Sequence, residues 1–388
     1  MKRGLQAAGA EGAGANLNAM KRTLVSIVAA LAVLAPIAAS PAAVAEPGPG
    51  YFASPNVEWI TNIPIETDSA GARLLGKYLY ITTGRGLAIY DVSKPEAPVR
   101  TGFLLLPQEP QFAEEDVDTN GKILLVETLG ELNVVDVEDK SNPVVIGKLE
   151  TSEHTVTCVL QCRWAYGSSG KIYDLRKPAN PKEAGSWMKG TPVNSSHDVT
   201  EVAPGMIMTS SQPLMLLDAR KNPAKPKPLA FGGNKDSRFI HSNIWPHKMK
   251  DKFLLVGGET VGNCDDEQAG AFMVWDATTW KKNKTFKMID DFHMKNGLPT
   301  DGDALANTFC SHWFETQADF KNGGMVAMAW YEHGTRFLNV SSKGKISEKG
   351  YFLPVGGATS GAYWITDRIL YAVDYQRGID IIKYTGKL

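Results

Sequence analysis

The sequence predicts an all-β protein folded as a seven-bladed β-propeller. One short phrase of apolar residues ending in Asp or Asn recurs along most of the chain, and a second β-rich run stands before each copy. The 3.6-residue periodicity of amphipathic helices is nearly absent. A strand, turn, strand, turn, strand order that repeats about every 40 to 60 residues is typical of propeller blades.

The clearest copy of the repeated phrase runs from Gly86 to Asp91 and is followed by Pro95 and Pro98. We expect its Asp side chain to cap the turn after the strand, and the prolines to stop the strand and protect its outer edge. Weaker copies follow, and seven copies predict seven blades. They end at Asp91, Asp136, Asp174, Asp218, Asp276, Asn339 and Asp380.

The run before each copy is expected to form the second strand of the same blade, because β-branched, aromatic and other apolar residues dominate it. The last blade supplies only three strands of its own, whereas residues 57–61 stand alone before the first blade. We expect this N-terminal strand to join the last blade and close the ring. The seven runs are 77–82, 122–127, 163–166, 206–209, 253–256, 325–330 and 369–373.

The phrase Gly-Leu-Ala-Ile-Tyr-Asp-Val at residues 86–92 and its echoes resemble the LVIVD repeat family. The resemblance covers the chain from about residue 70 to the C-terminus and is clearest in four blades. This family occurs in exported bacterial proteins and is regarded as propeller-like, so the resemblance implies the fold. It implies no particular activity, because one fold carries many functions.

The N-terminal segment has the features of a secretory signal peptide. Lys21 and Arg22 precede the apolar run 24–39, and an Ala-Val-Ala triplet ends at residue 45. Cleavage there would remove residues 1–45 and leave 46–388 as a single propeller domain. No other stretch reaches about 18 consecutive apolar residues, so we expect a secreted protein with no membrane span.

Charge and motifs limit the kinds of partner and reaction. The first 45 residues hold four of the 41 basic residues and one of the 42 acidic ones, so the remainder has a formal charge near −4. Nothing in this balance indicates nucleic acid or a membrane surface, and a small molecule or short peptide is the expected substrate. The sequence contains no phosphate-binding Gly loop, Gly-x-Ser-x-Gly elbow or His-Glu-x-x-His motif, which disfavours the common nucleotide enzymes and hydrolases.

Four cysteines in an exported chain are expected to pair, and three pairings are possible in principle. Cys264 falls in an insertion of the fifth blade, and Cys310 stands two residues before His312. A bond between them would hold the insertion beside that histidine. Cys158 and Cys162 would then close a small loop at the end of the third blade's innermost strand.

Five residues able to bind a metal begin the innermost strands of five blades when the blades are aligned on their second strands. Three of them, Glu115, His154 and His197, stand two residues before a valine, a spacing that puts both residues on one face of a strand. Innermost strands run beside the central channel, so equivalent positions form a ring around one axis. The five residues are Glu115, His154, His197, His241 and His312.

Such a ring predicts a transition-metal site with the four histidines as ligands. Glu115 would act as a ligand, as a partner of a ligand, or as a catalytic group. Imidazole nitrogen suits copper, zinc, iron and nickel, and we expect copper first, then iron or zinc, in a protein that folds outside the cell. The alternative is that the histidines are polar channel-lining residues bonded to water and carbonyl groups.

The turns between second and third strands lie on the same face as the starts of the innermost strands. Arg85, Arg336 and Arg377 are candidate substrate-binding residues there, because guanidinium groups match carboxylates; their alternative role is that of solvated turn residues. His333 is a candidate general base. Trp313 is a candidate for stacking on a planar or sugar-like ligand, with packing between blades as its alternative.

Together these residues favour a secreted metal-dependent enzyme, an oxidoreductase that acts on a small organic molecule at a histidine-lined site on the propeller axis. Two alternatives stay open. The first is a non-catalytic propeller that binds a protein, peptide or cell-wall polymer on one face. The second is a metal-assisted hydrolase or lyase with the same ligands, which a redox-silent divalent ion would favour.

Overall fold

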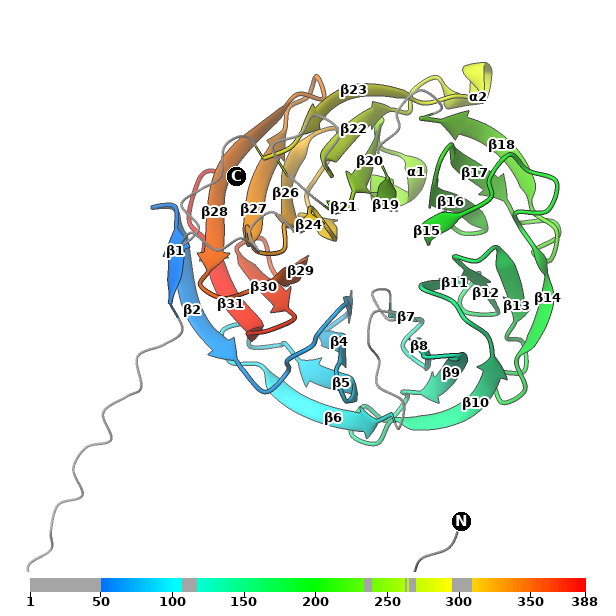
Figure 1. The fold of residues 1–388 in the computed structure, drawn as a ribbon, viewed down its shortest axis with the longest axis horizontal. Coiled ribbons are helices and arrows are strands. Elements are labelled where there is room, and N and C mark those ends of the chain that lie inside the picture. Colours follow the sequence, from blue (N-terminus) through cyan, green and yellow to red (C-terminus); the bar gives the residue numbers. More distant parts are fainter. Residues whose placement is uncertain (1–49, 107–116, 234–238, 262–263, 265–269, 295–308) are drawn as a thin grey trace, which may run out of the picture. The chain divides into compact units, whose positions relative to one another are not determined.

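Seven antiparallel sheets stand around a common centre in the computed structural model, which is the arrangement of a seven-bladed β-propeller (Figure 1). The all-β fold class is therefore confirmed. The propeller lies within Gly48–Leu388, which form one compact unit, and the signal peptide predicted at residues 1–45 falls outside the described residues. The structure describes residues 50–106, 117–233, 239–261, 264, 270–294 and 309–388.

Each blade runs from its innermost strand outward in chain order, as the repeated phrase predicts. The first three blades are β3 (Ala72–Leu75), β4 (Tyr78–Thr83), β5 (Gly86–Asp91) and β6 (Val99–Leu105); β7 (Asp118–Thr119), β8 (Ile123–Thr128), β9 (Glu131–Asp136) and β10 (Val144–Glu150); and β11 (Val156–Val159), β12 (Trp164–Gly167), β13 (Lys171–Asp174) and β14 (Lys182–Ser186). The next two are β15 (Ser196–Ala203), β16 (Met206–Ser211), β17 (Leu214–Asp218) and β18 (Lys227–Gly232); and β19 (Ile240–Ile244), β20 (Phe253–Gly258), β22 (Phe272–Asp276) and β23 (Lys287–Phe292). The last two are β25 (Phe314–Thr316), β26 (Gly324–Ala329), β27 (Thr335–Val340) and β28 (Ile346–Pro354); and β29 (Thr359–Trp364), β30 (Ile369–Asp374) and β31 (Gly378–Tyr384).

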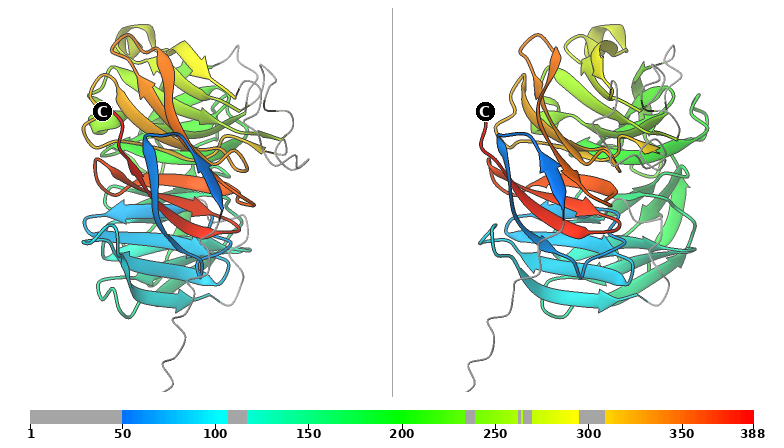
Figure 2. Two further views of the ribbon diagram at one scale, coloured as in Figure 1. Left: turned by 90° about the vertical axis from the view of Figure 1, so that its left-hand side faces the viewer. Right: turned by 60° about the vertical axis from the view of Figure 1, so that its left-hand side comes forward.

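Two N-terminal strands lie on the outside of the last two blades. β2 (Val57–Ile63) pairs antiparallel with β31 and is the outermost strand of the seventh sheet. β1 (Tyr51–Ala53) pairs with the end of β28 and gives the sixth sheet a fifth strand, which the sequence does not predict. Figure 2 shows both strands in blue against the orange and red strands of these blades. Segments from opposite ends of the chain therefore share hydrogen bonds.

The Asp that ends each repeated phrase caps the following turn in five blades. In the first blade, Oδ1 of Asp91 accepts a hydrogen bond from the backbone N–H of Ser93 at 2.8 Å. This bond satisfies a donor that the turn would otherwise leave open, which explains why the strand stops there. Asp136, Asp174, Asp218 and Asp276 each accept the same bond from the residue two positions on.

The hydrophobic cores lie between neighbouring blades. Between the fourth and fifth, Met208 and Leu216 pack with Leu254 and Met273, and all four are fully buried. Both faces of a blade pack against neighbouring blades. The strands therefore contain continuous runs of apolar residues. Successive blades also approach closely at the edge: a Cβ at Gly102 would lie 2.1 Å from a backbone carbonyl oxygen of the second blade, so only glycine fits there.

The fifth blade carries most of the irregular structure. Two short helices, α1 (Pro246–Met249) and α2 (Trp280–Asn283), lie beside its strands. A small separate sheet pairs β21 (Thr260–Val261) of this blade with β24 (Phe309–Cys310), which leads into the sixth. A disulfide joins Cys264 to Cys310 next to this sheet, and a second joins Cys158 to Cys162, so both predicted pairs are confirmed.

Candidate metal centre

Four histidines lie at the starts of the innermost strands of four successive blades. His154 stands two residues before β11, His197 is the second residue of β15, His241 the second of β19, and His312 stands two residues before β25. The strands β11, β15 and β19 follow one another around the centre of the propeller (Figure 1). The common register comes from the repeat, since each strand starts where the second strand of its blade ends.

The four imidazoles form one continuous cluster. The Nε2 atoms of His154 and His197 are 2.8 Å apart. The ring centroids of His197 and His241 are 3.9 Å apart, and those of His241 and His312 are 4.3 Å apart. His241 and His312 are each only 1% exposed. Imidazoles of four successive blades therefore contact one another in a chain, and within it ligand atoms of His197 and His241 lie close enough that they could share one ion.

A carboxylate that the sequence analysis did not single out completes this cluster. Glu259 follows β20 directly, and its Oε2 lies 4.0 Å from Nε2 of His197. Ligand atoms of Glu259, His197 and His241 all lie within 4.8 Å of one another, so small side-chain shifts would let the three bind one ion. The signal in the sequence is a Glu placed directly after Gly257 and Gly258, where the second strand ends and the insertion begins.

A backbone carbonyl group orients one of the four imidazoles from behind. Nδ1 of His312 forms a hydrogen bond with the carbonyl oxygen of Ser360 in β29 of the seventh blade. Because a carbonyl oxygen only accepts, Nδ1 is the donor of this bond, and Nε2 is the nitrogen through which His312 would bind an ion. The hydroxyl of Thr155 donates to the carbonyl oxygen of His197 at 2.9 Å and holds the two strand starts together. Imidazoles fixed from behind in this way are typical of metal ligands.

The structure describes one of the two candidate catalytic residues, His333. The other, Glu115, lies outside the described residues. His333 is 2% exposed and sits in the turn between β26 and β27, where its backbone N–H donates to the carbonyl oxygen of Trp330 at 2.8 Å. This turn also contains Tyr331, whose ring contacts His312 at a centroid distance of 4.8 Å.

The three candidate arginines each engage partners within the protein. Arg336 lies on β27 rather than in a turn and is 1% exposed. It pairs with Glu348 of β28 at 3.1 Å, and burial lowers its pKa. Arg377 pairs with buried Asp380 at 3.0 Å. The guanidinium of Arg85 lies 5.5 Å from the ring centroid of Phe103. These contacts stabilise their own blades and do not bring the three guanidinium groups together.

A cavity of about 490 Å³ opens directly beside the cluster. His154 forms part of its wall, together with the acidic residue Glu153, hydroxyl and amide groups and two apolar side chains, Leu129 and Met188. Among the residues that the structure describes, no Lys or Arg lines this cavity. Its hydroxyl groups include those of Ser169 in the third blade, Ser196 in the fourth and Ser152 in the connection between the second and third blades. A molecule in this cavity would contact the first histidine of the cluster.

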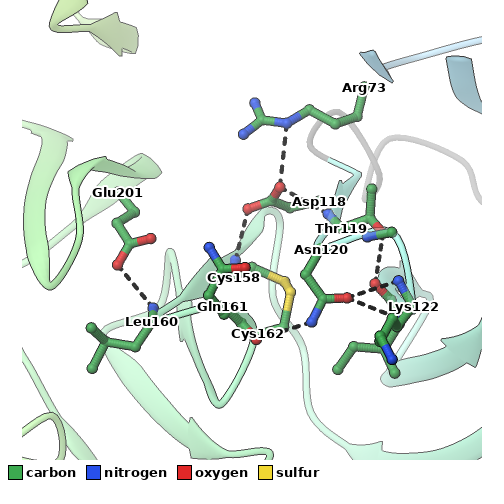
Figure 3. The surroundings of a disulfide bond; sticks show 12 residues. Arg73, Asp118, Thr119, Asn120, Lys122, Cys158, Leu160, Gln161, Cys162 and Glu201 are labelled. Carbon is green, nitrogen blue, oxygen red and sulfur yellow. Dashed lines mark hydrogen bonds and ion pairs between the residues drawn. A yellow bond between two sulfur atoms is a disulfide. The ribbon is translucent and has the colours of Figure 1, made fainter. Parts of the chain in front are cut away.

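Trp313 lines a different and smaller cavity of about 150 Å³, which also contacts the Cys158–Cys162 disulfide. Figure 3 shows its polar wall, where Asp118 lies 3.3 Å from Nε of Arg73. Glu201 accepts a backbone hydrogen bond from Leu160 at 2.8 Å, and burial raises the pKa of this carboxyl group. Residues 157–162 reach this cavity from the far end of β11, whereas His154 stands at its start.

Comparison with known families agrees with this architecture. The family model described as LVIVD repeat matches residues 69–103 and 117–151, which cover the first two blades. The chain carries LVIVD repeats. Its LVIVD propeller and two disulfides fit an extracellular protein. No curated protein matches the chain, and none of the described helices is long and apolar enough to cross a membrane.

Proposed function

We propose that this LVIVD propeller is a secreted metal-dependent oxidoreductase that acts on a small organic molecule. The observation that carries the proposal is the convergence of His154, His197, His241 and His312 from four blades into one cluster, with centroid distances of 4.4, 3.9 and 4.3 Å along it. The four imidazoles stand at the same position of four successive blades, and three of them are largely or fully buried. A shared metal site explains why a histidine recurs at this position.

The ligand set favours a borderline or redox-active transition metal. Four imidazoles and the carboxylate of Glu259 suit copper, and next iron or zinc, whereas calcium and magnesium prefer oxygen ligands. A copper or iron ion would supply electron transfer to or from the substrate. The histidines would hold it, the carbonyl oxygen of Ser360 would orient His312, and the surrounding blades would exclude bulk water.

The substrate side of the proposal rests on the cavity beside His154. Hydroxyl and amide groups in its wall would bind an uncharged polar molecule, and Leu129 and Met188 would cover apolar parts of it. Glu115 and His333 remain proposed acid and base groups. Arg85, Arg336, Arg377 and Trp313 stay candidates, although their present partners favour an uncharged substrate over an anionic one.

Elemental analysis tests the metal centre. We would purify the mature protein without a His-tag or chelator, compare it with the His197→Ala/His241→Ala variant, and measure copper, iron and zinc. We expect about one equivalent of one metal per chain in the parent protein and its loss in the variant. His247→Ala is the matched control, because His247 lies in α1 against the carbonyl oxygen of Phe320 and should leave the metal content unchanged.

The same experiment distinguishes the alternatives. No stoichiometric metal in either protein, even after incubation with each ion, would sink the enzyme proposal and favour a propeller that binds a protein, peptide or polymer. One equivalent of zinc with no redox activity would favour hydrolase or lyase chemistry at the same residues. Copper or iron would direct the activity screen to oxidation of small uncharged molecules.

A further inference from the structure

The phenol of Tyr331 contacts the carboxylate at the proposed metal centre. Its hydroxyl donates a hydrogen bond to Oε1 of Glu259 at 2.5 Å, while the other oxygen, Oε2, faces Nε2 of His197 at 4.0 Å. We infer that Tyr331 is a positioning residue that holds the Glu259 carboxylate toward the histidine cluster. This inference rests on the proposed metal centre and adds a specific role for a residue outside the ligand set.

The backbone at Tyr331 is held in a conformation that aromatic residues rarely adopt. Its φ is +44°, in the left-handed region that normally favours glycine. Backbone hydrogen bonds enforce it: the N–H and C=O of Tyr331 both bond to Thr359 of β29 at 3.0 Å, and the N–H of Gly334 donates to the same carbonyl at 2.9 Å. Such outliers persist where the surrounding structure over-determines them, and they concentrate at functional sites.

Ring contacts fix the direction of the phenol as well. The Tyr331 ring lies edge-on to His312 at 4.8 Å and is stacked on Tyr375 of the seventh blade at 6.2 Å with an interplanar angle of 6°. The side chain is 7% exposed. It therefore bridges a carboxylate of the fifth blade, a histidine of the sixth and a tyrosine of the seventh, and it has little freedom to turn away from Glu259.

The consequence concerns how the carboxylate binds. A hydrogen bond to one oxygen leaves the other free to face the ion and restrains rotation of the carboxyl group. Partners of this kind orient metal ligands, and their loss typically weakens metal affinity by about 10- to 100-fold. Tyr331→Phe keeps the ring and its contacts but removes the hydroxyl, so it isolates this hydrogen bond.

The test measures zinc(II) affinity by chelator competition and records the copper(II) EPR spectrum for the full mature chain. We expect Tyr331→Phe to weaken zinc binding by about 10- to 100-fold and to change the copper spectrum in the same way as Glu259→Gln. The double variant should bind no more weakly than Glu259→Gln alone, because both changes remove one interaction. Tyr51→Phe, on the outer edge of the propeller, is the matched control and should match the parent protein in both measurements.

Two results would overturn the inference while leaving the metal centre intact. One is a Tyr331→Phe variant with the affinity and copper spectrum of the parent protein. The other is an equal further loss of affinity when Tyr331→Phe is added to Glu259→Gln, which would show that the phenol acts independently of that carboxylate. If the parent protein binds neither ion, the proposed metal centre itself fails, and the inference fails with it. A circular dichroism melt of each metal-free variant checks that folding is unchanged.

Discussion

Glu127 and Glu153 are neighbouring acidic residues next to the histidine cluster. Glu153 directly precedes His154, the first histidine of that cluster. The backbone N–H of Glu153 donates to Oε1 of Glu127 at 2.9 Å, and Glu153 itself accepts bonds from Ser169 and Tyr173. Glu127 is 3% exposed. Burial, with a smaller contribution from the neighbouring Glu153, raises the pKa of Glu127 to about 8. Its neutral form is thus the stable one in the fold.

The raised pKa predicts a pH-dependent cost at this position. Unfolded Glu127 ionises above pH ~4.3, whereas the folded protein holds it protonated up to about pH 8, so the folded state loses stability between these values. Glu127→Gln keeps an acceptor oxygen and cannot ionise. We expect it to leave stability near pH 4 unchanged and to raise the free energy of unfolding at pH 8 by roughly 2 to 4 kcal/mol.

Urea unfolding of the metal-free protein at pH 4, 6 and 8 measures this effect. Glu96→Gln serves as the control, because Glu96 is exposed in the connection between β5 and β6. A stability gain in Glu127→Gln that is the same at all three pH values would contradict the assignment of a raised pKa.

Some residues of the candidate centre could be predicted from the sequence, and others could not. The histidines could be found because the repeat supplies a common register, and register fixes which residues begin the innermost strands. Glu259 and Tyr331 stand in turns that are particular to the fifth and sixth blades, so no equivalent residue in another blade points to them. Their positions depend on the distance between neighbouring blades, and the periodicity of the sequence gives no information about that distance.

Among the elements, β31 shows how one blade departs from the repeat to join the two ends of the chain. Its Asp380, where the repeated phrase is predicted to end, lies in the middle of the strand opposite Ala372, whereas Asp91 ends β5 opposite Tyr78. Asp380 is 1% exposed and binds different partners from the turn-capping Asp residues. Trp59 and Asn62 of β2 donate to its Oδ1 at 2.9 and 3.1 Å, and Arg377 pairs with it at 3.0 Å. One carboxylate therefore connects the N-terminal strand to the last blade.

This difference predicts unequal costs for the same substitution in two blades. Asp380→Ala would leave the largely buried Arg377 without its carboxylate and remove both bonds to β2, so we expect a loss of about 3 to 5 kcal/mol of unfolding free energy. Asp91→Ala removes a partly exposed cap and an ion pair with exposed Lys77 and should cost much less, because solvent screens exposed pairs. Guanidinium unfolding of both variants tests this, and equal losses would show that Asp380 has no special role.

The strands themselves were predictable where the repeat extends and not elsewhere. The phrase at Gly86–Asp91 forms β5, and the phrases that end at Asp136, Asp174, Asp218 and Asp276 end the third strands of their blades. The last two predicted ends are wrong, because β27 continues one residue past Asn339 and β31 continues four residues past Asp380. β1 was not predicted, because three residues at the edge of another sheet carry no periodic signal. The same holds for β21 and β24, which have two residues each and pair only because the chain folds back between the fifth and sixth blades.

At the scale of the whole molecule, each blade depends on its neighbours, because the apolar cores lie between them. Phe272 of the fifth blade and Phe314 of the sixth meet edge-on at 5.2 Å within one such core. The Cys264–Cys310 disulfide links the same two blades covalently on the side where His312 follows. The Cys158–Cys162 disulfide, by contrast, closes a loop within one blade.

Removing the two disulfides separately should therefore have different consequences. The Cys264–Cys310 bond spans 46 residues and the Cys158–Cys162 bond only four, which corresponds to stabilisation of roughly 4 and 2 kcal/mol in the chain-entropy account. Cys264→Ser/Cys310→Ser should lower the guanidinium midpoint more than Cys158→Ser/Cys162→Ser. It should also weaken zinc binding. Thr260, which follows Glu259, pairs with Cys310, which stands two residues before His312, so losing the disulfide would loosen the segments that carry these two proposed ligands. Equal midpoints together with unchanged zinc affinity would mean that non-covalent packing between the blades, rather than the disulfide, keeps the histidines and Glu259 in place.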